Sequence, residues 1–229
     1  MKLQLHFLEA EGSLAALRDQ LSDEVIGLVE QIDSFVPARF HRHTIDVVIQ
    51  SVPEEDEASV SGACFRRGFI TVSVDPKSVR LAADLDAGLF RQILARQLHH
   101  AMRWGVWGPA MTLGQTLVYE GLADIFAELV AATERPPWSS ALGEADWPPV
   151  IAQAEQDLEN DRYDHALWFL GTGALPRWAG FALGYRLACQ FAEGHPKAVA
   201  SGLVDVATPA VLAVWNEMTS AVLRVRPRV

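Results

Sequence analysis

Apolar residues in the first third of the chain follow two different periods. Between residues 14 and 32 they recur every three or four positions, which predicts an amphipathic helix. Residues 44–50 and 69–74 are short runs rich in β-branched side chains, and each run predicts a strand. Two dipeptides between these strands have the composition of turns: Ser61-Gly62 and Arg67-Gly68. We therefore expect a small sheet of two or three strands.

After residue 80 the apolar positions keep the helical period. Asp86 is the expected N-cap of a helix that reaches Gly105, and Thr112 is the expected N-cap of the next, which ends before Pro136. Further helices are expected over four ranges: about 150–159, 162–170, 177–193 and 209–223. A helix, a small sheet and then many helices predict an α+β fold that is mostly α. We expect one domain over 1–229, with a sheet-bearing part over about 1–80 and a helical part over about 81–223.

Composition narrows the class of protein. The 229 residues are 50% apolar and 21% charged, which is typical of a globular chain. The formal net charge of −10 argues against nucleic acid as a partner. No apolar stretch is long enough to span a membrane, and the N-terminus lacks the apolar core of a signal peptide. Cys64 and Cys189 are expected to be buried thiols in a reducing compartment, so the predicted location is cytoplasmic.

The segment Arg96-Gln97-Leu98-His99-His100 carries the clearest chemical signal. In a zinc peptidase these five positions are His, Glu, any, any, His: the two histidines share one helix face and bind zinc, and the Glu activates the metal-bound water. Here only the second histidine, His100, is present. Arg96 stands at the position of the first ligand, and Gln97 stands at the position of the general base.

A second segment, Leu117–Asp124, strengthens this comparison. It places Glu120 twenty residues after His100 on the next predicted helix, where zinc peptidases of the gluzincin type take their third ligand. Gly121 follows directly, and a glycine inside a helix is destabilising unless it serves another purpose. We therefore expect another backbone to approach this helix closely at Gly121.

Together these segments resemble a family of bacterial predicted zinc-dependent proteases, a gluzincin-like domain of unknown function. The resemblance covers about residues 40–215 and rests on these segments: His99–Trp104, Leu113-Gly114, Leu117–Asp124, Trp168–Gly171, Leu175–Phe181 and Gly184-Tyr185. It implies a zincin-like metallopeptidase fold with a small N-terminal sheet and a helical C-terminal half. The chain departs from the family's pattern at Arg96 and Gln97, and at Phe181, where a Tyr is common.

The first two departures remove the chemistry that the resemblance implies. Arg96 is a permanent cation and donates only, so it cannot bind zinc, and the Gln97 amide cannot accept a proton as a general base. We therefore predict a pseudo-peptidase with no active catalytic residue and no cofactor, in which His100 and Glu120 are remnant ligands. The Arg96 guanidinium is expected to replace the metal and pair with Glu120 and Asp124, because a buried carboxylate needs a partner.

The predicted role is then to bind a peptide or protein segment in the former active-site cleft, as a binding or regulatory protein. Pairing of that segment along an edge strand at residues 69–74 is the expected mode. His165 and Tyr185 are candidates for vestigial roles in holding a substrate or hydrogen-bonding a transition-state oxygen.

Two alternatives stay open. The first is an active zinc-dependent metallopeptidase with a non-standard site, in which His99, His100 and Glu120 bind zinc and Asp124 or Glu128 is the base. Adjacent helical residues point about 100° apart, which weighs against this ligand set. The second is an interaction protein with an apolar groove lined by tryptophans: Trp104, Trp107, Trp138, Trp147, Trp168 and Trp178.

Overall fold

The computed structural model describes residues 1–10, 12–52, 59–104, 111–133 and 135–224. Contacts divide the chain into two compact units. Unit 1 comprises Met1–Val106, Phe126–Glu134 and Ala200–Val204, and unit 2 comprises Trp107–Ile125, Arg135–Val199 and Asp205–Val229. The single domain over 1–229 stays a prediction.

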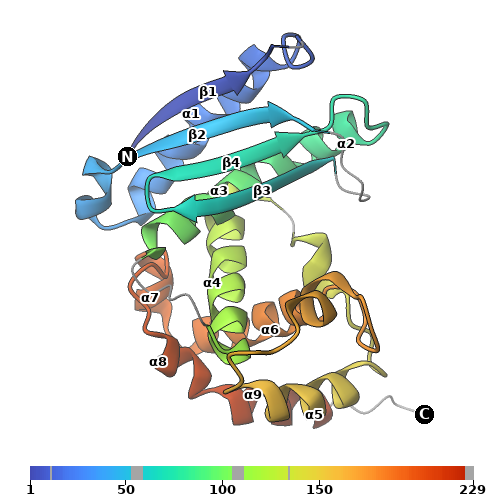
Figure 1. Cartoon of the computed structure of the whole chain (residues 1–229). Helices are drawn as coiled ribbons and strands as arrows, with labels where there is room; N and C mark the ends of the chain where they lie inside the picture. Colours follow the sequence, from blue (N-terminus) through green and yellow to red (C-terminus); the bar gives the residue numbers. More distant parts are fainter. Residues whose placement is uncertain (11, 53–58, 105–110, 134, 225–229) are drawn as a thin grey trace. The chain divides into compact units, whose positions relative to one another are not determined.

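Unit 1 is built on a four-stranded sheet (Figure 1). The strands are β1 (Lys2–Leu8), β2 (Thr44–Ser51), β3 (Val60–Arg66) and β4 (Phe69–Val74). Their order is β1-β2-β4-β3; β1, β2 and β4 are parallel, and β3 runs antiparallel to β4. The two predicted strands are therefore confirmed as β2 and β4, and two more are added. The turn at Arg67-Gly68 is also confirmed, because it joins β3 to β4.

Two expectations about this sheet were wrong. Ser61-Gly62 is not a turn but lies inside β3, where these small residues pair with β4. Residues 69–74 are not an edge strand, because β4 pairs with β2 on one side and β3 on the other. The edges of the described sheet are β1 and β3.

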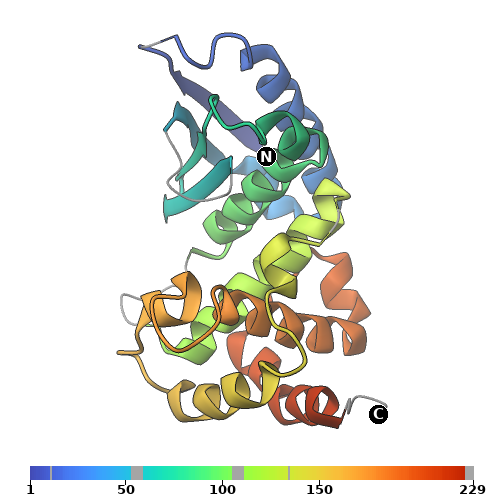
Figure 2. The same ribbon diagram turned by 90° about the vertical axis from the view of Figure 1, so that its right-hand side faces the viewer.

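One face of the sheet is covered by helices. α1 (Arg18–Phe35) and α3 (Leu89–Met102) pack against it, as Figure 2 shows from the side. Strand β2 explains why, since Ile45, Val47 and Ile49 are buried while the residues between them are exposed or half-buried. The helix predicted over 14–32 is confirmed as α1, although it begins at Arg18, and Leu21, Val25, Leu28 and Ile32 of its apolar stripe are buried.

The connection into α3 differs from the prediction. Asp86 ends a separate short helix, α2 (Leu81–Asp86), so it does not cap α3. The N-cap of α3 is Gly88, whose φ of 78° is left-handed. An added Cβ there would lie 2.5 Å from Cγ2 of Thr133, so only glycine fits this turn. α3 ends at Met102, and the predicted stop at Gly105 lies outside the described residues.

Helix α4 (Leu113–Ala131) contributes its residues up to Ile125 to unit 2 and the remainder to unit 1. Its predicted cap is confirmed as a reciprocal pair of hydrogen bonds. The backbone N–H of Gln115 donates to Thr112 Oγ1 (3.3 Å), and the backbone N–H of Thr112 donates to the side-chain Oε1 of Gln115 (3.0 Å).

Most other elements are helical. They are η1 (Ala38–Arg42), η3 (Pro137–Ser140), α5 (Trp147–Asp157), η4 (Ala166–Leu170), α6 (Ala179–Gly194), α7 (Pro196–Ala200), α8 (Thr208–Leu212) and α9 (Trp215–Arg224). The helix predicted over 162–170 is only the single π-type turn η4, and a turn at 213–214 divides the one predicted over 209–223. The α+β, mostly α prediction is confirmed. No helix in the described part of the chain has the length and hydropathy to span a membrane.

Candidate functional site

The residues of the altered zinc motif lie together on α3, in unit 1. Arg96, Gln97, His99 and His100 are all more than nine-tenths buried, on a helix that is itself buried along nearly its whole length. Charged and amide side chains are seldom buried in this way unless they are paired or have a role. Gln97 is therefore inside the protein, not on a solvated helix face.

The edge strand β3 lies directly against this motif. An added Cβ on Gly62 would come within 2.7 Å of Ile93 Cγ2 and 2.9 Å of Gln97 Cγ on α3. These distances are shorter than van der Waals contact, so only a glycine lets the strand approach the helix so closely. The structure thereby brings the position of the general base next to the sheet edge, a juxtaposition that the sequence interpretation missed.

His99 belongs to the core of unit 1. Its ring packs against that of Phe126 at a centroid distance of 5.0 Å, tilted by 33°, and is fully buried. Burial, with the nearby charges of Arg103 and His100, holds the pKa of His99 well below its ordinary value, so this histidine is neutral. A ring packed on Phe126 does not fit the non-standard ligand set in which His99 binds zinc beside His100.

Arg103 anchors the end of α3. Its side chain is buried, and Nη1 donates to the carbonyl oxygens of Leu203 and Val204, each at 3.2 Å. The chain can present both carbonyls because Gly202 and Leu203 have φ values of 69° and 58°. The motif helix is thus tied to a segment one hundred residues later.

In unit 2, Glu120 lies on α4 beside a very close helix contact. An added Cβ on Gly121 would lie 2.0 Å from the carbonyl oxygen of Gly184 on α6, and one on Gly184 would lie 2.4 Å from the carbonyl oxygen of Leu117. The close backbone approach predicted at Gly121 is therefore confirmed. It fixes the turn of α4 that carries Glu120 against α6.

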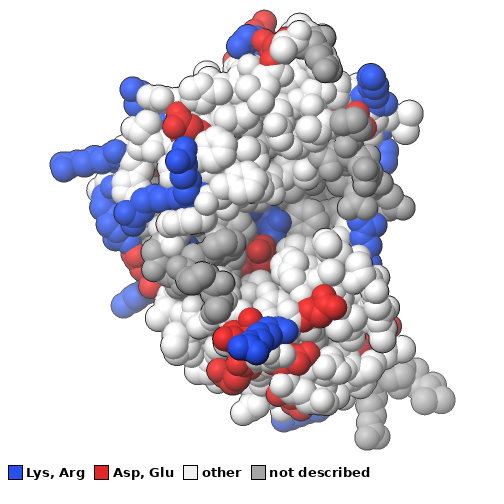
Figure 3. Space-filling model, in the orientation of Figure 1, with Lys and Arg blue, Asp and Glu red and all other residues white. Residues whose placement is uncertain are grey.

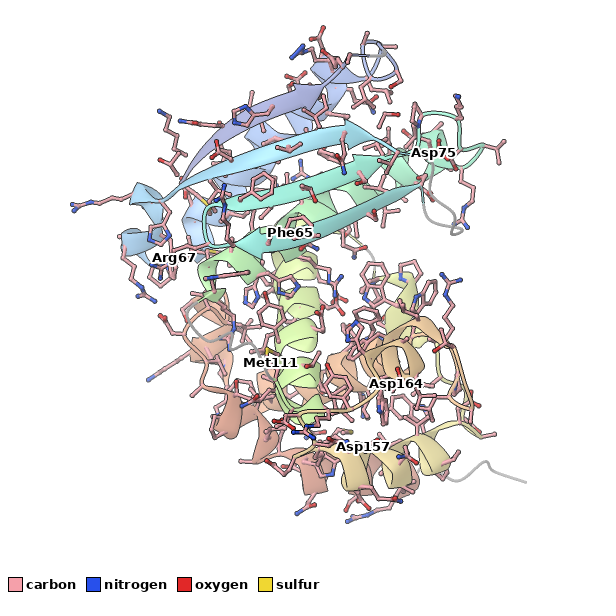
Figure 4. The ribbon with its side chains drawn as sticks, viewed as in Figure 1. Phe65, Arg67, Asp75, Met111, Asp157 and Asp164 are labelled. Atoms are coloured by element: carbon pink, nitrogen blue, oxygen red, sulfur yellow. The ribbon has the colours of Figure 1, made fainter. Side chains whose placement is uncertain are left out.

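Asp124 lies one turn after Glu120 on α4 and is fully buried. Its Oδ2 accepts a hydrogen bond of 3.0 Å from the indole Nε1 of Trp138. Trp138 is half-buried, and its indole is held by the Asp124 carboxylate. Trp168 is fully buried, and its indole N–H donates a hydrogen bond of 3.3 Å to Asp157, which Figure 4 labels. These two tryptophans pack in the protein, and Trp107 lies outside the described residues.

Tyr163 is a site residue that the sequence interpretation missed. Its hydroxyl lies 2.8 Å from Thr116 Oγ1 and 3.5 Å from His165 Nδ1. Either hydroxyl can be the donor in the Tyr163–Thr116 hydrogen bond, and Thr116 Oγ1 also donates to the Thr112 carbonyl oxygen (3.1 Å). Burial raises the pKa of Tyr163; the Thr116 hydrogen bond opposes this, and the charge of Glu120 raises it further. His165, which is exposed, therefore lies in a cluster with Tyr163 and Thr116.

Tyr185 has different surroundings. It lies buried in α6, and the Arg135 guanidinium carbon is 5.9 Å from the centroid of its ring. Phe181, one turn earlier, contacts the rings of Phe169 (4.8 Å) and Trp138 (6.1 Å). Phe181 thus contributes a purely apolar ring to an aromatic cluster.

The donor chemistry of these residues can be compared with what a metal requires. Unit 1 holds Arg96, Gln97 and His100, and unit 2 holds Glu120 and Asp124. Within the ranges that the structure describes, no group of three or more His, Cys, Asp or Glu side chains could hold a metal ion. The pairing of Arg96 with the two carboxylates stays a prediction.

Comparison with known proteins adds one finding. A family model described as predicted Zn-dependent protease (DUF2268) matches residues 46–210, which is well over half of the chain. Searches of curated proteins and of solved structures give no match. The matched range runs from β2 to α8 and includes both the motif helix α3 and the helix α4 that carries Glu120. The chain therefore belongs to the family of predicted Zn-dependent proteases (DUF2268).

Proposed function

We propose that this chain is a catalytically degenerate zinc metallopeptidase homologue with a zincin-like fold, which binds a peptide or protein segment and does not cleave it. The observation that carries the proposal is the burial of Arg96 and Gln97 on α3, with Gln97 against the edge strand β3. The two side chains that replace a zinc ligand and a general base are built into the site and are not solvated.

The donor set does not fit catalytic zinc. Such sites use three protein ligands and leave one position for water. Arg96 offers only donors and a permanent positive charge, and His99 is packed on Phe126. His100 and Glu120 remain, which is one ligand too few, and Gln97 cannot take the proton that the mechanism requires.

In our proposal the Arg96 guanidinium replaces the metal as the partner of Glu120 and Asp124. Asp124 is fully buried, and a buried carboxylate is costly unless it is paired and hydrogen-bonded. Trp138 supplies one hydrogen bond to Asp124, and a guanidinium can supply the compensating charge with fork geometry. His165 and Tyr185 keep vestigial roles beside this site.

The ligand in this proposal is an extended peptide or protein segment paired along β3. This strand replaces residues 69–74 as the proposed docking edge, because β3 is the edge strand that lies against α3. We place the protein in the cytoplasm, since its two cysteines are unbridged and half-buried.

Metal analysis with a peptidase assay tests the proposal. Protein purified without added zinc should contain far less than one zinc per chain by atomic absorption, and it should not cleave a mixed fluorogenic peptide library. Near-stoichiometric zinc together with proteolysis that a chelator abolishes would overturn the proposal in favour of an active metallopeptidase with a non-standard site.

A pair of variants tests the role of the two replaced residues. Arg96→His combined with Gln97→Glu restores the His-Glu-x-x-His pattern and should bind zinc tightly where the natural chain does not. Arg91→His is the matched control, because Arg91 lies on the same helix but makes ion-pair contact with Glu24 (3.1 Å), away from the motif. Zinc uptake equal in the two variants would contradict the assignment of Arg96 to the first ligand position.

A further inference from the structure

The last residues of β3 depart from regular strand geometry. The register with β4 shifts between Cys64, which pairs with Ile70, and Arg66, which pairs with Phe69. Phe65 is the extra residue of this β-bulge. Bulges at sheet edges redirect side chains, so neighbours that would face opposite sides of a strand can face the same side.

The bulge directs an aromatic and a cationic side chain to the same neighbour. The rings of Phe65 and Phe69 stack at 6.0 Å, and the guanidinium carbon of Arg66 lies 5.2 Å from the centroid of the Phe69 ring. Phe65 is 61% exposed, which is unusual for so large an apolar side chain. The outer end of the edge strand therefore offers an apolar ring and a charge together.

More positive charge surrounds this end of the sheet. η1 and the β3–β4 turn carry exposed arginines, which with Arg66 form what we call the arginine cluster: Arg39, Arg42, Arg66 and Arg67. Figure 3 shows Lys and Arg side chains gathered here, and Figure 4 labels Phe65 and Arg67. Within the described ranges, no carboxylate pairs with Arg42, Arg66 or Arg67. Burial lowers the pKa of His43, and the nearby charges of Arg67 and Arg39 lower it further.

We infer that the ligand of this protein is an extended segment with acidic residues at the end that reaches the arginine cluster, and an apolar side chain beside Phe65. The inference rests on the proposed function, because it specifies which segment pairs along β3. Exposed guanidinium groups at Arg42, Arg66 and Arg67, on a chain of net charge −10, attract carboxylates and repel basic segments.

The strand geometry sets the spacing of this recognition. Gly62 faces Gln97 on α3 and pairs with Val72, whereas Arg66 pairs with Phe69, so the bulge leaves three ladder positions between them, which is about 10 Å at about 3.3 Å per residue. The acidic residue of the ligand should therefore lie about three positions from the residue beside Gln97. Between the two, a side chain of the added strand on the open face of the sheet contacts the exposed ring of Phe65.

Fluorescence anisotropy with labelled synthetic peptides tests this. The probes are alternating Thr-Val peptides that end in three Glu at either the amino or the carboxyl end, with matching Gln and Lys versions. One of the Glu peptides should bind at least tenfold more tightly than its Gln version, with an affinity that falls as salt rises. The Lys versions should not bind.

Charge-reversal variants locate the site. Arg66→Glu with Arg67→Glu should weaken binding of the Glu peptide at least tenfold, whereas Arg66→Lys with Arg67→Lys should keep most of the affinity. The matched control is Lys77→Glu with Arg80→Glu, because these exposed residues follow Asp75 at the other end of β4 and the change in net charge is the same. All the altered side chains are exposed, and the ion pair of Arg80 with Asp84 (3.6 Å) lies at the surface, where such pairs contribute little to stability, so the fold should be unaffected.

The outcomes separate this inference from the proposed function. Equal binding of the Glu and Gln peptides would overturn the inferred preference for acidic residues but would leave the proposed peptide binding intact. The zinc and peptidase assays test the loss of catalysis and do not depend on either binding result. No effect of the Arg66 and Arg67 reversal would mean that these arginines only protect the edge from aggregation, which also overturns the inference. Binding of an oligonucleotide in place of any peptide would overturn it as well.

Discussion

The contact between α4 and α6 leads to a quantitative prediction for Gly121→Ala. An alanine normally stabilises a helix interior by about 1 kcal/mol relative to glycine. At Gly121, however, the new Cβ would lie 2.0 Å from the Gly184 carbonyl oxygen and 2.4 Å from its carbon. These are backbone atoms of another helix, so the whole helix must shift by an ångström or more.

The magnitude follows from these opposing effects. Adding a methyl group to a well-packed contact lowers the free energy of unfolding by about 1–3 kcal/mol. The upper end of this range applies here because the atoms in the way are backbone atoms and no flexible side chain can move aside. Subtracting the helix preference of about 1 kcal/mol leaves a net destabilisation of about 2 kcal/mol. For a chain of this length the melting temperature should fall by about 4–8 °C.

Gly27→Ala is the matched control. Gly27 lies in the middle of α1, and its added Cβ would meet only Nη1 of Arg91, the end of a flexible side chain, at 3.3 Å. This variant should be stabilised by about 0.5–1 kcal/mol. Gly184→Ala probes the same contact from α6, since its Cβ would lie 2.4 Å from the Leu117 carbonyl oxygen, and it should resemble Gly121→Ala.

Thermal and urea unfolding followed by far-ultraviolet circular dichroism provide the measurement. The reasoning would be refuted if Gly121→Ala melted at or above the temperature of the natural chain while Gly27→Ala gained stability as expected. That result would mean that α4 and α6 do not meet at these glycines, and that the turn carrying Glu120 is not held by this contact.

Two further predictions concern buried groups on α3. Arg103→Met should destabilise the chain by about 3 kcal/mol in urea titration, because it removes two charge-assisted hydrogen bonds to the carbonyls of Leu203 and Val204 and leaves both buried oxygens without that donor. A loss below about 0.5 kcal/mol would show that the segment is held by other contacts. The pKa of His99 is lowered in the folded chain. As the pH falls below about 6.5, the imidazole of His99 is therefore protonated in the unfolded chain before it is protonated in the folded chain. The free energy of unfolding should consequently drop by about 2 kcal/mol between about pH 7.5 and 5. His99→Phe should remove that part of the pH dependence, whereas His41→Gln, at an exposed site, should keep it; an unchanged slope in His99→Phe would assign the effect elsewhere.

Local patterns in the sequence were enough for much of the fold. The apolar stripe of α1 and the β-branched runs of β2 and β4 are properties of neighbouring residues, and Thr112 caps α4 through a partner only three residues away. Strand β1 was missed although it alternates polar residues with Leu3, Leu5 and Phe7, because a strand this short is stabilised by pairing with β2, forty residues later.

The elements that the sequence misassigned depend on distant contacts. Ser61 and Gly62 have the composition of a turn, but pairing with β4 and close packing on α3 make them strand. Asp86 has the chemistry of an N-cap, but the chain needs a left-handed residue before α3, and Gly88 provides it against Thr133. In both cases tertiary packing outweighs a local preference of about 1 kcal/mol.

The sequence by itself determined the identity of the groups at the site. In our proposal Arg96 and Gln97 stand where a ligand and a base would be, and no folding changes the fact that a guanidinium donates and an amide is not a base. Only the tertiary structure decided what surrounds them: that β3 and not β4 is the edge strand beside Gln97, that His99 is a neutral core residue, and that the charge of Glu120 acts on Tyr163. The physical reason is that the chemistry of a side chain is intrinsic, whereas burial, electric field and strand neighbours arise only when segments far apart in the chain pack together.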